Sequence, residues 1–92
     1  MVEEVKEYLK ITWDDEDVYI GKMIERGKDK LQNLTGTSLD FTLENSAKTL
    51  LLDYCRYSYN NALEYFEKNF ESEILRLQLQ EAVKENEQAE QA

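Results

Sequence analysis

The sequence has no histidine, no proline and only one cysteine, Cys55. The absence of histidine removes the commonest general base and a frequent metal ligand. A lone cysteine cannot form a disulfide within the chain, and no histidine is present to activate it as a nucleophile. A glycine-rich phosphate-binding loop is also missing. We therefore expect no enzymatic activity, no cofactor and no metal site, and we interpret Cys55 as a buried structural thiol.

Long hydrophobic segments are absent as well. No apolar run approaches the ~18 residues that are typical of a membrane-spanning helix. The first ten residues, "MVEEVKEYLK", lack the basic and apolar regions of a signal peptide. These two absences, together with the single cysteine, predict a protein that is made and kept in the cytosol.

Positive charge is scarce. The chain has 11 lysines and arginines against 20 aspartates and glutamates, which gives a net charge of −9. Such an excess of negative charge argues against non-specific binding to a phosphate backbone. It favours solubility, basic partners or repulsion of nucleic acid.

The 92 residues do contain helical periodicity, which predicts an all-α fold. We expect a short helix over 2–10, a long helix over about 15–34 that stops at Gly36, and a third helix from Thr42 or Asn45 to Phe70. The segment from residue 71 fits a strand or a helix, and its strong helix formers favour helix. The prediction is a small bundle of three to four helices with one long central helix. Residues 1–83 form a single domain, and residues 84–92 form a polar, frayed tail.

The apolar positions of the second and third predicted helices define the expected core. Gly27 lies within the apolar stripe of the second helix, so we expect a close contact between helices there. Leu39 and Phe41 are expected to fold inward from the loop that follows Gly36. The predicted core residues are Ile20, Met23, Ile24, Gly27, Leu31, Leu34, Leu51, Tyr54, Cys55, Ala62 and Phe66.

Four consecutive acids stand in the segment "ITWDDEDVYI", residues 11–20. The segment lacks the glycine and the ligand spacing of an EF-hand loop, and a carboxylate di-metal site would need histidine. A helix start fits better. Asp14 is then the N-cap, Asp17 is its partner at N3, and Trp13 with Val18 has the spacing of a hydrophobic staple.

Charged residues suggest one possible contact between subunits. Lys22, Arg26 and Lys30 recur every four residues and so share a helix face. This face is either solvated or in contact with an acidic surface, and both readings remain open. The candidate acidic surface is formed by residues of the first helix in a neighbouring copy: Glu3, Glu4 and Glu7.

The order of these features resembles a known family. The segment "VKEYLKITWDDEDVYIGKMIERGKDKLQNLTG" is similar to the opening of the small head–tail connector (adaptor) proteins of tailed phages and prophages. The segment "AKTLLLDYCRYSYNNALEYFEKNFESEILRLQLQ" is similar to the second half of the same family. The resemblance spans roughly residues 2–83 and rests on the order and spacing of moderately specific motifs.

The resemblance implies a structural subunit of an oligomeric ring. Such a ring docks under the portal, contacts tail-completion proteins and extends a channel through which DNA passes without specific binding. It also implies assembly in the cytoplasm of a bacterial host and incorporation into the virion, with no membrane contact. The alternative from composition is a small acidic interaction module, either a DNA-mimicking inhibitor or an antitoxin-like regulator, that binds one basic protein.

Overall fold

A computed structural model describes the backbone of residues 1–91 and the side chains of residues 1–85. These residues form α1 (Val2–Leu9), α2 (Asp17–Thr35), α3 (Ser46–Tyr59), the 3₁₀ turn η1 (Leu63–Tyr65), α4 (Phe66–Asn69) and α5 (Glu71–Gln91). Helix accounts for 74% of the structure and no strand occurs among the residues described, so the all-α prediction is confirmed. The finer prediction of three to four helices with one long central helix is not confirmed. The described part has five α-helices, and α5, with 21 residues, is longer than α2, with 19.

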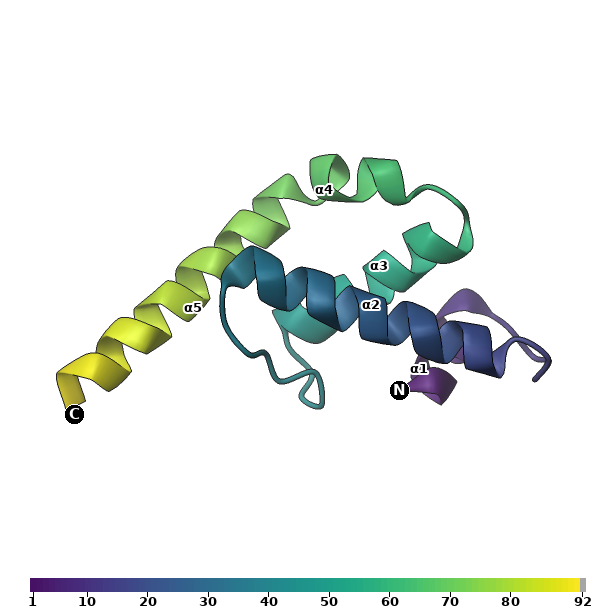
Figure 1. Ribbon diagram of the computed structural model, residues 1–92, viewed down its shortest axis with the longest axis horizontal. Helices are drawn as coiled ribbons and strands as arrows, with labels where there is room; N and C mark the ends of the chain where they lie inside the picture. Colours follow the sequence, from purple (N-terminus) through teal and green to yellow (C-terminus); the bar gives the residue numbers. More distant parts are fainter. Residues whose placement is uncertain (92) are drawn as a thin grey trace.

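The helices are arranged around α2, which lies along the middle of an elongated molecule (Figure 1). The principal extents are 49 × 25 × 17 Å. α2 contacts α1, α3 and α5, and α3 makes the most extensive of these contacts. α5 leaves the body at the end opposite the loop that precedes α2 (Figure 1). α5 remains helical through residues 84–91, and Ala92 lies outside the described residues. The division into a domain over 1–83 and a polar tail over 84–92 stays a prediction.

The core fills the space between α2 and α3 and extends to α1, α5 and the loop before α3. Among the predicted core residues, Leu34 and Ala62 are only partly buried. Phe41 is buried and Leu39 packs against the core from the same loop, as the sequence predicted. The other predicted core residues are buried: Ile20, Met23, Ile24, Gly27, Leu31, Leu51, Tyr54, Cys55 and Phe66. Core residues that the prediction omitted are Val5, Ile11, Ala47, Leu50, Ile74 and Leu77.

Gly27 lies at a close contact between α2 and α3. A Cβ atom at this position would lie 2.6 Å from Leu51 Cδ1 and 2.8 Å from Tyr54 Cδ1. Neither distance leaves room for a methyl group, since Leu51 is fully buried and Tyr54 is 8% exposed. The close helix contact predicted at Gly27 is therefore confirmed.

α1 ends through a lysine in the left-handed conformation. Lys10 has φ 60° and ψ 39°, although it carries a Cβ. The N–H of Ile11 donates to the carbonyl of Lys6 at 2.8 Å, and the N–H of Lys10 donates to the carbonyl of Glu7 at 3.2 Å. These two bonds form a Schellman motif, in which glycine is the usual residue at the left-handed position.

Replacing Lys10 with glycine should raise the stability of the protein. Glycine adopts the left-handed conformation without the steric cost of a Cβ, which is about 1 kcal/mol. For a domain of this size, that gain corresponds to a rise of ~4–8 °C in the melting temperature. Thermal unfolding followed by circular dichroism would measure it. Lys10→Ala is the control, because it removes the same charge and keeps the Cβ. Equal melting temperatures for the two variants would contradict the strain at Lys10.

α3 is shorter than predicted. It begins at the Asn45 cap, whose Oδ1 accepts the N–H of Lys48 at 2.9 Å. It ends at Tyr59, so the prediction of one helix continuing to Phe70 is wrong. Asn61 has φ 57°, and the N–H of Ala62 returns to the carbonyl of Tyr57 at 2.8 Å. Asparagine tolerates the left-handed conformation better than most residues, so the Asn60–Asn61 pair ends the helix and turns the chain into η1.

Candidate interaction surfaces

The acidic run before α2 binds a lysine of the same chain. Lys6, on α1, is 5% exposed. Its Nζ lies 2.5 Å from Asp14 Oδ1 and 2.9 Å from Asp17 Oδ1. The hydrogen bond to Asp14, followed by the contact with Asp17, raises the pKa of Lys6 above its ordinary value. Burial opposes the charged form, and the two carboxylates more than offset that effect.

The predicted cap of α2 is therefore wrong. The residue before the helix is Glu16, and no side chain accepts a hydrogen bond there. Asp14 and Asp17 are directed to Lys6 instead of to the first N–H groups of the helix. Because the residue before the helix is Glu16, Trp13 and Val18 do not stand at the N′ and N4 positions of the predicted staple, and they are 47% and 76% exposed.

Glu16 joins the start of α2 to α3. Its Oε1 accepts hydrogen bonds from Trp13 Nε1 at 2.6 Å and from the hydroxyl of Tyr59 at 2.9 Å. Three of the four acids in the run thus bind groups of the same chain. Within the described residues, no group of three histidine, cysteine or acidic side chains could hold a metal ion.

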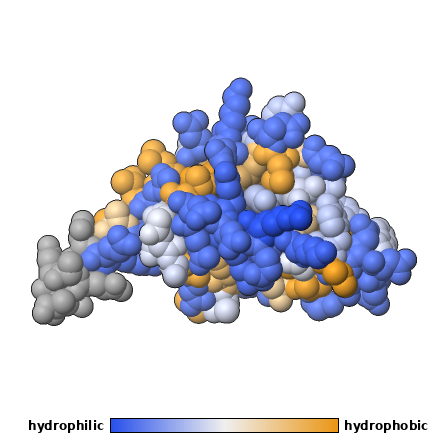
Figure 2. Space-filling model, viewed as in Figure 1, coloured by the Kyte–Doolittle hydropathy of each residue, from blue (hydrophilic) through white to orange (hydrophobic). Residues whose placement is uncertain are grey.

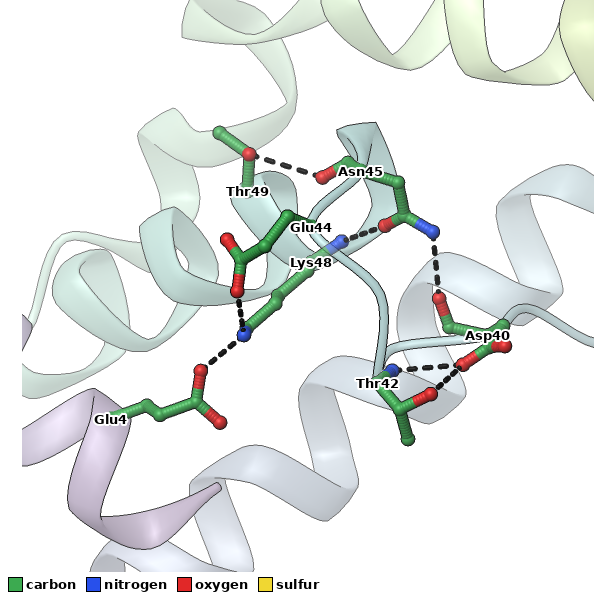
Figure 3. A network of polar contacts seen from close by, with 7 residues as sticks. All are labelled: Glu4, Asp40, Thr42, Glu44, Asn45, Lys48 and Thr49. Atoms are coloured by element: carbon green, nitrogen blue, oxygen red, sulfur yellow. Dashed lines mark hydrogen bonds and ion pairs between the residues drawn. The ribbon is translucent and has the colours of Figure 1, made fainter.

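A second buried lysine, Lys48, connects α3 to α1 (Figure 3). Its ammonium group forms ion pairs with Glu4 of α1 and with Glu44, which precedes the Asn45 cap. Hydrogen bonds to these two carboxylates raise the pKa of Lys48, and the bond to Lys48 lowers the pKa of Glu4. Since Glu4 already has this partner, it is not a free acid on the surface of α1.

Tyr8 supplies a further link between α1 and α3. Its hydroxyl donates to Asp53 Oδ1 at 2.5 Å, and Arg56 Nη2 lies 3.4 Å from the same oxygen. Asp53 is only 8% exposed. The hydrogen bond to Asp53 raises the pKa of Tyr8, because the bond favours the protonated hydroxyl that donates it. Polar contacts on Glu4, Lys6 and Tyr8 thus fasten α1 to both α2 and α3.

The predicted basic stripe lies on the exposed side of α2. Lys22, Arg26 and Lys30 are all exposed. Lys30 Nζ lies 2.5 Å from Glu67 Oε1 of α4. Lys22 and Arg26 form no ion pair with the described residues of the chain. The structure brings no member of this stripe into an ion pair with the acids of α1, of which Glu3 and Glu7 are exposed.

Exposed apolar side chains gather on α5, and the sequence reasoning did not single them out. Leu75, Leu79 and Val83 are 54%, 59% and 55% exposed and are spaced four residues apart. Figure 2 shows hydrophobic residues along this part of the molecule, next to the grey atoms. Ile74 and Leu77 on the same helix are buried. The signal in the sequence was the excess of apolar positions over residues 74–83, which is more than one helix face needs.

Cys55 is fully buried, as the sequence predicted. Burial raises the pKa of its thiol to about 12, so the group is protonated at neutral pH and is a poor nucleophile. No helix among the residues described is long and apolar enough to cross a membrane.

The described residues form a small, acidic, all-helical fold with exposed apolar and charged surfaces. The sequence pattern of the family described as phage gp6-like head-tail connector protein matches residues 1–91. The chain belongs to this family of phage structural proteins. No curated protein and no solved structure matches the chain.

Proposed function

We propose that this protein is a structural subunit of a phage or prophage head–tail connector ring that docks under the portal and extends the DNA channel. The observation that carries the proposal is the family match over residues 1–91. Portal and tail-completion proteins are the partners under this proposal. The host cytoplasm is the site of assembly, and the virion is the final location.

The charge of the chain is consistent with a DNA channel. A net charge of −9 repels a phosphate backbone, which suits a channel that DNA must leave as readily as it enters. A ring also needs two different surfaces that meet head to tail, because contacts between identical surfaces close at a dimer. The elongated subunit, with distinct side chains exposed at its two ends, offers such surfaces.

Light scattering of the purified chain, with and without the portal protein of the same phage, tests the proposal. We expect a discrete oligomer at high protein concentration, on the portal, or both. A chain that stays monomeric at high concentration and low salt, and that the portal does not change, would overturn the ring proposal. If an oligomer does form, cryo-electron microscopy of it would give the number of subunits.

The alternative of an acidic DNA-mimicking module has weaker support. Such a module needs a free array of carboxylates that copies the spacing of phosphates. Asp14 and Asp17 here bind Lys6, and Glu4 and Glu44 bind Lys48. The most concentrated acids of the chain are therefore partly neutralised within the subunit.

The basic stripe and the acidic residues of α1 are a candidate pair of subunit surfaces. Glu4 and Lys30 already have partners within the chain. Among the residues whose side chains are described, Glu3 and Glu7 on α1 and Lys22 and Arg26 on α2 form no ion pair. We propose that the acidic residues of α1 in one subunit face the basic stripe of α2 in the next. Contacts of this kind between exposed charges contribute little individually and are screened by salt.

Reversing the charge of Lys22, Arg26 and Lys30 together should weaken assembly, more at low salt than at high salt. The double variant Lys22→Glu/Arg26→Glu should account for most of the effect, because Lys30 pairs with Glu67 within the subunit. Sedimentation velocity at two salt concentrations would measure the change. Lys10→Glu/Lys68→Glu is the control for the double variant, because it makes the same change in net charge at other exposed positions. Unchanged assembly of the triple variant would assign the stripe to solvent.

A further inference from the structure

α5 is apolar on two opposite sides. Ile74 and Leu77 face the body and are 7% and 3% exposed. Gln78 fastens the same side through a hydrogen bond from its Nε2 to the carbonyl of Leu34 at 2.8 Å. On the other side stands the α5 stripe, defined as Leu75, Leu79 and Val83, each more than half exposed. A contiguous row of exposed apolar side chains on a helix that already buries another side marks a surface that is normally covered by a partner.

A second apolar group lies at the other end of the molecule. This α2 patch is defined as Trp13, Val18 and Tyr19, which are 47%, 76% and 43% exposed. The start of α2 and the far end of α5 occupy opposite ends of the long axis (Figure 1). Gln78, within the α5 stripe segment, bonds to Leu34 near the C-terminal end of α2, whereas Val18 and Tyr19 stand at its N-terminal end, so one subunit cannot cover its own α5 stripe with its own α2 patch.

We propose that the α5 stripe of one subunit docks on the α2 patch of the next copy of the same chain. This inference rests on the proposed ring and names the surfaces through which its subunits meet. The contact is head to tail, so each subunit uses one surface at each end and leaves neither exposed in a closed ring. Pairing of two α5 stripes would instead close at a dimer and leave both α2 patches uncovered.

Charges beside the two surfaces are complementary. Arg76 is exposed and stands one helical turn from Leu79, at the edge of the α5 stripe. Asp15 is exposed three residues before Val18 and forms no ion pair among the described residues. Asp14 is adjacent, with its side chain 85% exposed although it contacts Lys6. An apolar centre with an arginine facing aspartates at its rim is the common composition of a protein interface.

Cysteine cross-linking of the full-length chain tests this contact. The single variants Val18→Cys and Leu79→Cys are mixed at a concentration that gives assembly, with portal protein added if assembly requires it. A short bifunctional thiol reagent is then applied. Cys55 is fully buried and should not react. The unaltered chain, treated with the same reagent, is the control for this expectation. We expect a covalent dimer from the mixture and little from either variant alone. The double variant Val18→Cys/Leu79→Cys should give a ladder of higher oligomers.

Leu43 provides the matched control, because it is 59% exposed, the same fraction as Leu79. Replacing Leu79→Cys with Leu43→Cys in the mixture should lower the yield of covalent dimer about tenfold, because Leu43 lies outside both proposed surfaces and its thiol is not brought close to Val18→Cys. Equal yields, or a dimer formed mainly by Leu79→Cys with itself, would overturn the inference. If light scattering shows a ring without this cross-link, the inference fails and the proposed function stands. If no oligomer forms with or without the portal, both fail.

Discussion

Replacing Gly27 with alanine is expected to destabilise the protein, whereas the same replacement at Gly21 in the same helix is expected to stabilise it. At Gly27 the new methyl group would lie 2.6 Å from Leu51 Cδ1 and 2.8 Å from the ring of Tyr54. Overpacking of this kind costs about 1–3 kcal/mol. At Gly21 no atom lies within 4 Å of the new methyl group, so only the gain in helix propensity of up to ~1 kcal/mol remains.

The difference between the two variants isolates the packing cost, because the change in backbone entropy is common to both. Urea unfolding of the two variants and the parent gives the free energies of unfolding directly. The double variant Gly27→Ala/Leu51→Val should recover part of the loss, since it removes one methylene carbon from the crowded side chain. Equal stabilities for Gly27→Ala and Gly21→Ala would show that α2 and α3 are not held at the described distance.

Replacing Phe66 with alanine is expected to cost about 3–5 kcal/mol, a large part of the stability of a domain of this size. The Phe66 side chain is 2% exposed and is the first residue of α4. Its ring packs edge-on against Tyr54 at 5.4 Å and Tyr57 at 5.9 Å between centroids, and lies 5.2 Å from the ring of Phe70. These contacts attach the segment after the Asn61 turn to α3, so their loss should release α4 and loosen α5.

Two measurements separate local release from global unfolding. Urea unfolding gives the total loss, and hydrogen exchange should show lower protection in α4 and α5 than in α2. Tyr65→Ala is the matched control, because Tyr65 is the adjacent aromatic residue and is 55% exposed. It should change the free energy of unfolding by less than ~1 kcal/mol. A loss at Phe66 no larger than that at Tyr65 would contradict the role of this ring.

The sequence predicted those elements that short-range patterns determine. The apolar stripe of α2 and its stop at Gly36 follow from helical spacing and from glycine chemistry, and the structure places the helix at Asp17–Thr35. The Asn45 cap was one of two options, and the bond from the Lys48 N–H selects it. The glycine in the stripe also predicted a close contact between helices, which the structure places between α2 and α3.

Other features depend on partners that are distant in the chain or on competing local signals. Lys48 is buried because it meets Glu4, 44 residues earlier, and no local pattern marks such a pair. In the sequence, the acids before α2 are compatible with capping the helix as well as with binding a distant lysine. In the structure, Asp14 and Asp17 point to Lys6. The break after Tyr59 was hidden because aromatic and apolar residues continue at helical spacing across Asn60 and Asn61. For subunit contacts, the sequence pointed to charges on α1 and α2, which stay a prediction, and it did not point to the stripe on α5.

The links between distant segments also determine when this protein can fold during its synthesis. Tyr8 bonds to Asp53, Glu16 to Tyr59 and Leu34 to Gln78, which are 45, 43 and 44 positions apart. The first two bonds require only residues up to Tyr59. Once α3 has emerged from the ribosome, α1, α2 and α3 can therefore already pack against one another. The third bond waits until Gln78 emerges from the ribosome. α5 is thus the last of the described helices to join the body, so the α5 stripe becomes part of the fold only after α1, α2 and α3 have met.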